Sequence, residues 1–236
     1  MARLVRTWNV FHGNTLPPGR HAHLEVMIRL AVADEPTVVC LQEVPGWGLG
    51  RLARWSGMTA VGAVAAYPRL RSAEVGRLVT DLHHGSLRSA LTGQANAILV
   101  HAGLAVSDEH AEQISSTGER RVCQAIRIDG LGVVANFHAT GGAPADEHFR
   151  RAAAFAESVA ENGEPIVLCG DVNLVPGQGE TYAALAERGY SAPAPGIDQV
   201  LVRGLPSEPA VVWAPERRRV DGRLMSDHAP VDVMVG

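Results

Sequence analysis

The sequence lacks the features that mark secreted, membrane-spanning and disulfide-stabilised proteins. No apolar run approaches the roughly 18 residues that cross a membrane. Residues 1–6 lead straight into a strand pattern, without the apolar core of a signal peptide. The three cysteines are odd in number, dispersed and set in apolar runs, which predicts buried reduced thiols and argues against disulfides or a zinc site. These absences predict a cytoplasmic protein with no membrane span.

A surplus of positive charge is also missing. The chain has 21 lysine and arginine residues against 25 aspartate and glutamate residues, for a formal net charge of −4. Its one basic run is residues 217–219. Non-specific binding of a polyanion depends on concentrated positive charge. The composition therefore does not suggest such binding, although the net charge of the whole chain would not reveal a local basic patch.

The order of apolar patterns predicts a domain built mainly from strands. The 236 residues suit one large domain, and no linker, low-complexity tract or short repeat divides them, so residues 1–236 are interpreted as a single domain. Strands are expected at residues 4–10, 37–41, 59–66, 95–100, 122–128, 131–137, 166–169, 197–202, 210–213 and 229–235. Helices are expected at residues 21–33, 47–55, 145–160 and 181–188. Two packed sheets flanked by helices fit this order better than a regular βαβ alternation.

The pattern also predicts how some strands pair, and it leaves one segment without an assignment. Residues 95–100 and 122–128 are predicted to pair with each other. Gly130 is predicted to form a hairpin turn between the strands at 122–128 and 131–137. Residues 69–93 show only a weak helical pattern around Leu78, and their role is not assigned.

Polar side chains stand at or beside the ends of many of the apolar runs. They are Asn9, Gln42, Glu43, Asn136, His138, Asp171, Asn173, Asp198, Ser226, Asp227 and His228. Buried strands rarely carry such groups unless the groups converge on a site. The pattern therefore predicts that these side chains meet in one functional centre.

The types of residue in this set indicate chemistry with a hard metal ion. Carboxylates, carboxamides and imidazoles are present without a nucleophilic cysteine or serine motif, and Mg²⁺ or Mn²⁺ prefers oxygen ligands. Such an ion neutralises a phosphate and helps to polarise an attacking water. Asp171 could orient or deprotonate that water, and Asn173, on the same side if the segment is extended, could bond a phosphate oxygen. His228 would need a partner to fix its tautomer, and Asp198 is a candidate.

Each group also has a purely structural interpretation. The Asp171–Asn173 segment could be a turn or cap, Gln42 and Glu43 could simply lead out of the core, and His138 could be a satisfied core histidine. For Glu119, Arg120 and Arg121, surface charge is favoured over phosphate contact. What favours function is the conjunction, since every structural explanation would have to hold independently.

The ordered set resembles the endonuclease/exonuclease/phosphatase superfamily over nearly the whole chain. The matching residues are Trp8-Asn9, Leu41-Gln42-Glu43, Asn136-Phe137-His138, Gly170-Asp171-Val172-Asn173, Ile197-Asp198-Gln199 and Ser226-Asp227-His228-Ala229-Pro230. The resemblance implies an α/β (α+β) four-layer sandwich of two mostly antiparallel β-sheets flanked by helices. It also implies cleavage of phosphoester bonds by an activated water with Mg²⁺, or Mn²⁺, as cofactor.

The resemblance also implies a role for each matching residue. The metal-side residues would be Asn9, Glu43 and Asp227, and the catalytic residues would be His138, Asp171, Asn173, Asp198 and His228. Within that set Asp171 would position the water, Asn173 would hold phosphate or water, and Asp198 would orient His228 against the scissile phosphate. Two positions depart from the family pattern. Val172 replaces a common phenylalanine, and Gln199 stands where many relatives have an aromatic residue or a histidine.

Three functions follow from these observations. The first is a divalent-metal-dependent phosphodiesterase or phosphatase acting on a phosphorylated small molecule or a phosphodiester. The second is a nuclease, which the acidic charge and the sparse recognition loops of a short chain do not favour. The third is a catalytically silent member that binds a phosphorylated ligand or a protein. The sequence does not assign the particular phosphoester, the number of metals or the oligomeric state.

Overall fold

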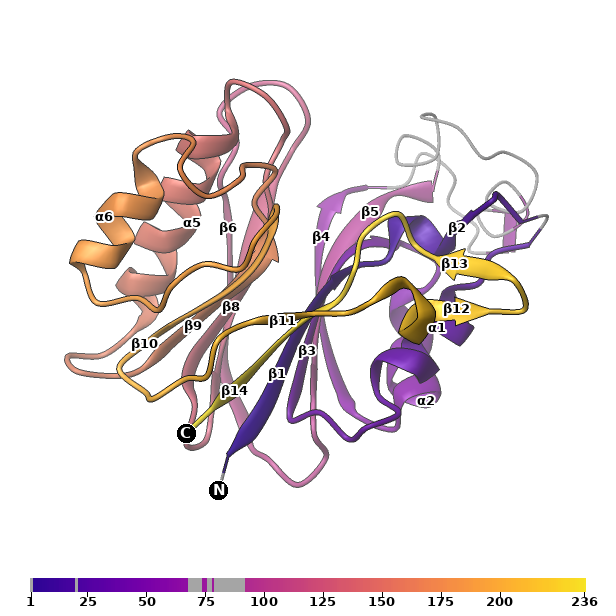
Figure 1. Ribbon diagram of the computed structural model, residues 1–236, viewed down its shortest axis with the longest axis horizontal. Helices are drawn as coiled ribbons and strands as arrows, with labels where there is room; N and C mark the ends of the chain where they lie inside the picture. Colours follow the sequence, from indigo (N-terminus) through magenta and orange to yellow (C-terminus); the bar gives the residue numbers. More distant parts are fainter. Residues whose placement is uncertain (1, 20, 68–73, 76–77, 79–91) are drawn as a thin grey trace.

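Two β-sheets pack face to face, and helices cover their outer sides (Figure 1). The computed structural model of the protein describes residues 2–19, 21–67, 74–75, 78 and 92–236. Within these residues no helix is both long and apolar enough to span a membrane. The mixed sheets and outer helices confirm the α+β sandwich expected from the sequence.

The larger sheet has six strands and one parallel pair. Its order is β11 (Val211–Val212), β14 (Val231–Val235), β1 (Arg3–Asn9), β3 (Val38–Pro45), β5 (Gln94–Val100) and β4 (Thr59–Ala66). The pair β1 and β3 is parallel, and every other pair in this sheet is antiparallel.

The second sheet has five strands and again one parallel pair, β8 and β9. Its order is β10 (Asp198–Arg203), β9 (Ile166–Asp171), β8 (Gly132–His138), β7 (Val122–Ile128) and β6 (Val106–Gln113). A small third sheet consists of β12 (Arg219–Val220), β13 (Arg223–Met225) and β2 (Thr15–Leu16). The expectation of mostly antiparallel sheets is therefore confirmed.

The helices lie outside the two large sheets because each has one apolar face. Helices α1 (Leu24–Ala31) and α2 (Leu52–Ser56) cover the six-stranded sheet, and α5 (Ala145–Val159) and α6 (Thr181–Glu187) cover the five-stranded sheet (Figure 1). The side chains that α1 buries are Leu24, Met27, Ile28 and Ala31, which recur at helical spacing. The result is the four-layer arrangement of helix, sheet, sheet and helix.

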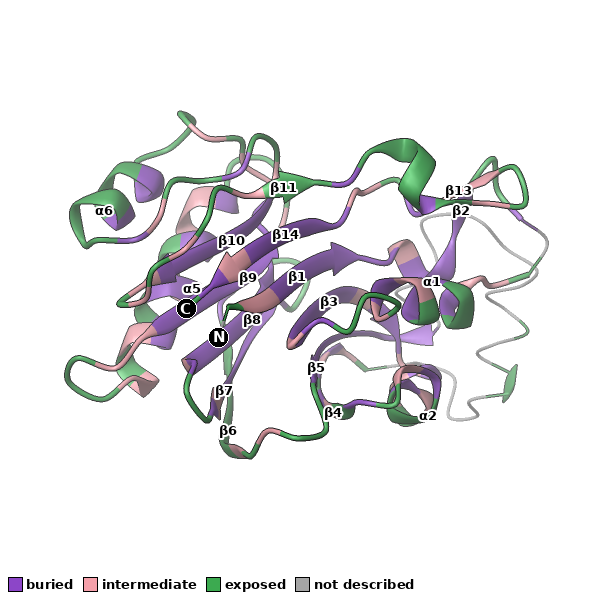
Figure 2. Cartoon of the chain, turned by 60° about the horizontal axis from the view of Figure 1, so that its bottom comes forward, coloured by how far each residue is buried: buried purple, intermediate pink, exposed green. Residues whose placement is uncertain are grey.

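The space between the sheets is filled by small and branched apolar residues. Strands β1, β3, β8 and β9 are buried on both faces (Figure 2). Cys40 and Cys169 belong to this inner layer, whereas Cys123 packs with the cluster beneath α5. All three cysteines are free and buried, as the sequence predicts.

The predicted pairing of residues 95–100 with 122–128 is wrong. Strand β5 lies between β3 and β4 in one sheet, whereas β7 lies between β6 and β8 in the other. Both strands are buried on both faces, so their apolar patterns do not show which sheet they join. The sequence interpretation also missed β6, an edge strand whose last seven residues are exposed and, apart from Ala111, polar. Gly130 does form the predicted turn between β7 and β8, with φ of 72°.

The end of β3 and the helix expected near Leu78 are two further predictions to compare with the structure. Strand β3 does not end at Gln42 and Glu43 but continues to Pro45 through a bulge, where Glu43 takes a left-handed φ of 54°. The extra residue of the bulge turns the strand locally and re-aims the Glu43 side chain. The helix expected within residues 69–93 falls mostly outside the described residues.

Gly170 allows β9 to lie close to β8. A Cβ atom at this position would overlap the carbonyl oxygen of Phe137, its partner in the parallel pair. Only glycine permits this approach. The next pair in the same register is His138 with Asp171, so the close contact at Gly170 helps to bring these two residues side by side.

Candidate active site

The predicted site residues come together at one end of the sandwich. Asn9 ends β1, His138 ends β8, Asp171 ends β9 and Asp198 begins β10. In the strand register Asp171 pairs with His138 on one side and with Asp198 on the other. Strand ends from both sheets thus place these side chains against one another, although they lie up to 189 positions apart in the sequence.

Asn9 links the two sheets through its amide. Its Nδ2 donates to Oδ2 of Asp171 at 3.0 Å and to Oε1 of Glu43 at 3.3 Å, and its Oδ1 accepts the backbone N–H of Phe11 at 2.9 Å. The amide nitrogen therefore faces the carboxylates, and the amide oxygen is engaged with the backbone. Asn9 holds two acidic groups together, and its role beside a metal stays a prediction.

Asp171 is the most deeply buried carboxylate of the cluster, at 1 % exposed. Burial and the negative charge of Asp198 raise the pKa of its carboxyl from 3.8 to about 7, although His228, Asn9 and the N–H of Asn173 oppose the shift. A carboxyl that titrates near neutral pH is suited to accept a proton from a water molecule.

Asn173 reaches the site by a different geometry from the one expected. Its backbone is left-handed, with φ of 52°, and its N–H donates to Oδ1 of Asp171 at 3.0 Å. The segment is therefore a tight turn rather than extended strand. Its Nδ2 lies 3.2 Å from Nε2 of His138 and donates to the carbonyl of Ala139 at 3.0 Å, so the amide still borders the site.

His228 and Asp198 form the predicted pair. Nδ1 of His228 lies 2.9 Å from Oδ2 of Asp198, and its Nε2 lies 3.7 Å from Oδ2 of Asp171. Burial alone would lower the pKa of His228, but the hydrogen bond to Asp198 and the charges of Asp198, Asp171 and Asp227 together raise it to about 9. The imidazole therefore holds a proton at neutral pH, with Nε2–H directed into the site.

His138 is held in the opposite state. Its Nδ1 lies 2.9 Å from Nη1 of Arg121 and 3.0 Å from the side-chain amide of Gln94, and its Nε2 lies 3.2 Å from Nδ2 of Asn173. Burial, followed by the charges of Arg121, His228 and His12, lowers the pKa of His138 well below its usual value. The ring is therefore neutral, and its Nε2 lies 3.4 Å from Oδ2 of Asp171.

Arg121 corrects an interpretation made from the sequence. Surface charge was favoured for Glu119, Arg120 and Arg121, but Arg121 is only 8 % exposed. Besides His138, it donates to Oγ1 of Thr140 at 3.2 Å and to Oε2 of Glu119 at 3.0 Å. Arg121 directly precedes β7, so its position immediately before an apolar strand was the one signal that the sequence offered.

Glu43 is accompanied by a residue that the sequence interpretation missed. Nε2 of His12 lies 3.3 Å from Oε2 of Glu43, and Nε2 of His138 lies 4.0 Å from Oε1. His12 is buried and takes a left-handed φ of 53° in the short turn after β1. Its closeness in sequence to Asn9 was the one available signal.

Gln42 and Asn136 lie in the core beneath the site and connect the two sheets. Nε2 of Gln42 donates to Oδ1 of Asn136 at 2.7 Å, and Nδ2 of Asn136 donates to the carbonyls of Leu41 and Ala97. Both side chains are fully buried and join the two sheets across the core. They are structural, because a buried amide that lost these partners would leave polar groups without hydrogen bonds.

The loop before β14 fixes His228 in place. Oγ of Ser226 donates to the carbonyl of Asn9 at 2.7 Å and accepts the N–H of His228 at 3.1 Å. Nε1 of Trp8 donates to the carbonyl of His228 at 3.0 Å. Asp227 is exposed on the rim, with Oδ1 4.0 Å from Nε2 of His228, and its metal-side role stays a prediction.

Both departures from the family pattern have a structural explanation. Val172 is fully buried in the cluster beneath α5, so it fills core space without touching the site. The amide of Gln199 accepts the N–H of Ala194 and donates to the carbonyls of Ala194 and Gly196. It therefore clamps the loop that leads into Asp198.

The carboxylates of this centre suit a divalent cation. One oxygen of Asp198, Oδ1, is buried without a hydrogen-bond partner, and ligand atoms of Asp171, Asp198 and His228 lie within 4.8 Å of one another. Oδ2 of Asp198 already bonds His228, however, whereas Glu43 is half-buried and reaches the same space from the facing sheet. Oxygen donors that are crowded and incompletely paired match the preference of Mg²⁺ or Mn²⁺.

A four-layer sandwich with carboxylates and two histidines gathered at one end fits the phosphoester hydrolases in general, and the comparisons with known proteins support this class. The model of the endonuclease/exonuclease/phosphatase family matches residues 7–228, and the chain belongs to this family. No curated protein matches the chain at a significant level.

Solved structures with low sequence identity share the fold. A family protein from Bacteroides thetaiotaomicron is 14 % identical, with a TM-score of 0.71 over 100 % of this chain and 97 % of that one. A mannosyl-6-phosphatase from the same species is 15 % identical, with a TM-score of 0.70 over 99 % of each chain. The catalytic domain of human Nocturnin, solved with a bound sulfate anion, is 14 % identical, with a TM-score of 0.67 over 100 % of this chain and 94 % of that one.

Proposed function

We propose that this protein is a divalent-metal-dependent hydrolase of phosphoester bonds, acting on a phosphorylated small molecule or a small phosphodiester. One observation carries the proposal. Oδ2 of Asp171 lies between the Nε2 atoms of two histidines, at 3.4 Å from His138 and 3.7 Å from His228. An acceptor for a water proton thus stands beside the charged N–H of His228, a donor suited to phosphate oxygens, and beside the imidazole of His138.

The protonation states of the site residues indicate which of them accepts a proton and which of them donates a hydrogen bond to the phosphate. Asp171, with a pKa of about 7, orients the attacking water and accepts its proton. His228, with a pKa of about 9, presents a charged N–H to an oxygen on phosphorus, where negative charge increases during attack. The neutral ring of His138 and the side-chain amide of Asn173 border the same space from the other side.

The cofactor proposed for this centre is Mg²⁺ or Mn²⁺. When bound, such an ion neutralises phosphate charge and favours a nucleophile at neutral pH. Glu43 would hold it, with Asp227 at the rim. Asn9 would keep Glu43 and Asp171 at a fixed separation, because its Nδ2 donates to both carboxylates.

Replacing Glu43 with glutamine should lower turnover by at least about 100-fold, because a carboxylate that anchors an ion contributes several kcal/mol to the reaction. Stability should change little or rise, since a charge is removed from an acidic cluster. Turnover against Mg²⁺ concentration measures the effect, with Glu187→Gln on the exposed end of α6 as the matched control. An unaltered Mg²⁺ dependence in Glu43→Gln would remove Glu43 from the site.

A screen of purified protein distinguishes this function from a silent binding protein. The substrates are a bis-aryl phosphate, an aryl phosphate, plasmid DNA and phospholipid head-group esters, each with and without Mg²⁺ or Mn²⁺. Metal-dependent turnover of an aryl or bis-aryl phosphate that Asp171→Asn abolishes supports the hydrolase. Absence of turnover on all four substrates, together with binding of a phosphorylated ligand, would favour the silent member.

Binding to duplex DNA should be weak and should depend only shallowly on salt. The net charge is acidic, and the surface arginines Arg127, Arg150, Arg188 and Arg217 are engaged in ion pairs. A protein that grips several phosphates loses affinity steeply as salt rises. Fluorescence anisotropy of a labelled duplex from about 50 to 200 mM salt tests this. Tight binding with a steep log–log slope would favour the nuclease instead.

A further inference from the structure

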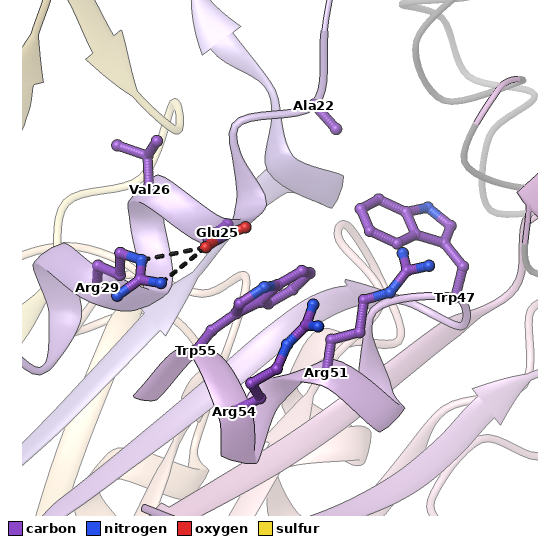
Figure 3. Close-up of a pocket in the computed structure, with 8 residues that line it drawn as sticks. All are labelled: Ala22, Glu25, Val26, Arg29, Trp47, Arg51, Arg54 and Trp55. Carbon is purple, nitrogen blue, oxygen red and sulfur yellow. Dashed lines mark hydrogen bonds and ion pairs between the residues drawn. The ribbon is translucent and has the colours of Figure 1, made fainter. Parts of the chain in front are cut away.

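The half-buried carboxylate of Glu43 has no arginine partner among the described residues. The side chains within ion-pair distance of it are the imidazoles of His12 and His138. Glu25, in the pocket between α1 and α2, is by contrast held by two N–H groups of Arg29 (Figure 3). A partly buried carboxylate without such a partner favours the binding of another cation.

Asn9 turns the wrong side of its amide toward this carboxylate to act as a metal ligand. Its Nδ2 donates to Glu43 at 3.3 Å and to Asp171 at 3.0 Å, while its Oδ1 accepts the N–H of Phe11 at 2.9 Å. An amide nitrogen is a donor of hydrogen bonds and has no acceptor capacity to offer an ion. With the amide in this orientation, a further ligand beside Glu43 has to come from another side chain.

His12 places a nitrogen atom at the distance that such a ligand requires. Its Nε2 lies 3.3 Å from Oε2 of Glu43, whereas Asn9 contacts the other oxygen, Oε1. A charge-assisted hydrogen bond between these groups would measure about 2.8 Å. Two atoms that bind one cation, each at about 2.1 Å and with an angle of about 90–109° between them, lie roughly 3.0–3.4 Å apart. The observed separation falls in the second range.

The turn after β1 fixes the imidazole at this place despite a conformational cost. Phe11, His12 and Gly13 all have left-handed φ values, of 45°, 53° and 83°. Residues other than glycine persist in this region only where the surrounding structure holds them. Here the N–H of Phe11 is bound by Asn9, and the N–H of Gly13 donates to the carbonyl of Val10 at 2.7 Å. His12 is thereby buried, at 7 % exposed, with its ring beside Glu43.

We propose that His12 is a nitrogen ligand of the cation that Glu43 binds, and that this ligand makes Mn²⁺ rather than Mg²⁺ the preferred ion. The inference rests on the proposed function, because it concerns the same metal site. Imidazole binds first-row transition ions better than it binds Mg²⁺, whose ligands are oxygen atoms. Carboxylates alone would discriminate much less between the two ions.

Electron paramagnetic resonance of Mn²⁺ tests the proposal without any turnover. The signal of free Mn²⁺ falls as the protein binds the ion, which gives one dissociation constant, and competition by Mg²⁺ gives the other. We expect the protein to bind Mn²⁺ at least about tenfold more tightly than Mg²⁺. The electron spin echo of the bound Mn²⁺ should show modulation by a directly coordinated imidazole ¹⁴N.

Two substitutions distinguish a metal ligand from a hydrogen-bond partner of Glu43. His12→Asn suits the left-handed backbone, but its amide ends at the δ position, short of the Nε2 that faces Glu43. It should weaken Mn²⁺ binding at least about tenfold and Mg²⁺ binding less than about threefold, and it should remove the ¹⁴N modulation. His12→Gln offers an oxygen of similar reach, so it should lower the preference for Mn²⁺ over Mg²⁺ at least about tenfold. His110→Asn, on the exposed strand β6, is the matched control and should change neither affinity.

Equal losses of Mn²⁺ and Mg²⁺ affinity in His12→Asn would show that His12 only orients Glu43, and would overturn the proposal. Bound Mn²⁺ without ¹⁴N modulation, or modulation that His12→Asn leaves unchanged, would also overturn it. Failure of the proposed function gives a different result. The unsubstituted protein would then bind neither ion at about 5 mM, or Glu43→Gln would bind Mn²⁺ as tightly as the unsubstituted protein, and the inference would fall with the metal site.

Discussion

Replacing Asp171 with asparagine should lower turnover by about 10³-fold, within the range expected for loss of a general base. Asparagine keeps the size of the side chain, but its single carbonyl oxygen can accept only one of the two N–H bonds that Asn9 and Asn173 donate to different oxygens of Asp171, and it cannot take a proton from water. The measurement is turnover of an aryl phosphate at saturating Mg²⁺. Asp129→Asn, at an exposed hairpin position, is the matched control.

The same substitution should stabilise the metal-free protein. The pKa of the buried carboxyl is about 7 in the folded chain and 3.8 as its ordinary value, so ionisation at neutral pH costs folding free energy. We expect Asp171→Asn to raise the free energy of unfolding by about 1–3 kcal/mol at pH 8, allowing for its coupling to His228.

The pH dependence of this gain follows from the sign of the shift. Below about pH 4 both states hold the proton and the variant should gain nothing. Between pH 4 and pH 7 the unfolded parent releases its proton while the folded parent keeps it, so the parent loses stability relative to the variant. Above pH 7 the difference should stay constant. Urea unfolding at several pH values tests this, and a variant no more stable than the parent at pH 8 would contradict the buried charge.

Removing the His228 side chain should lower turnover by about 10²- to 10³-fold, because the phosphate oxygens lose a charged donor. Asp198→Asn should cost somewhat less, since the imidazole remains but loses the carboxylate that holds its ring in place, with Oδ2 2.9 Å from Nδ1. The double variant should be barely worse than His228→Ala alone, because the two residues act as a unit. A double-mutant cycle on turnover measures the coupling.

The pH profile of Asp198→Asn gives an independent readout of this pairing. Asp198 contributes strongly to the raised pKa of about 9 at His228, and its neutral replacement lowers that pKa. The protonated donor is then lost at a lower pH, so the basic limb of the turnover profile should move down. Fully multiplicative losses in the cycle, with an unmoved basic limb, would show that Asp198 and His228 work independently.

Much of the fold could be predicted because the spacing of apolar residues along the sequence indicates which faces of a strand or helix are buried. Apolar runs such as Val38 to Leu41 and Ile166 to Cys169 are strands covered on both sides, and the spacing in α1 predicts an outer helix. The pairing of β5 and the existence of β6 could not be predicted. A strand buried on both faces carries no mark of its neighbours, and a polar edge strand carries no apolar alternation.

The candidate site divides in the same way. Asn9, His138, Asp171 and Asp198 were identifiable because polar groups at the ends of apolar strands must find partners, and strand ends meet at one edge. Asn173 was identified with the wrong backbone, since a left-handed turn leaves no trace in a pattern of period two. Arg121 and His12 were missed because charged and polar residues beside strands resemble ordinary surface residues until packing encloses them.

The sequence by itself therefore determined most of the strands and most of the polar residues that stand at their ends. Only the tertiary structure decided which proton each group holds. His138 is neutral because it is buried and lies beside the charge of Arg121, from the start of a neighbouring strand, whereas His228 is charged because Asp198 lies 2.9 Å from its Nδ1. The physical reason is that a proton state depends on burial and on charges within a few ångströms, and those neighbours come from strands far apart in the chain.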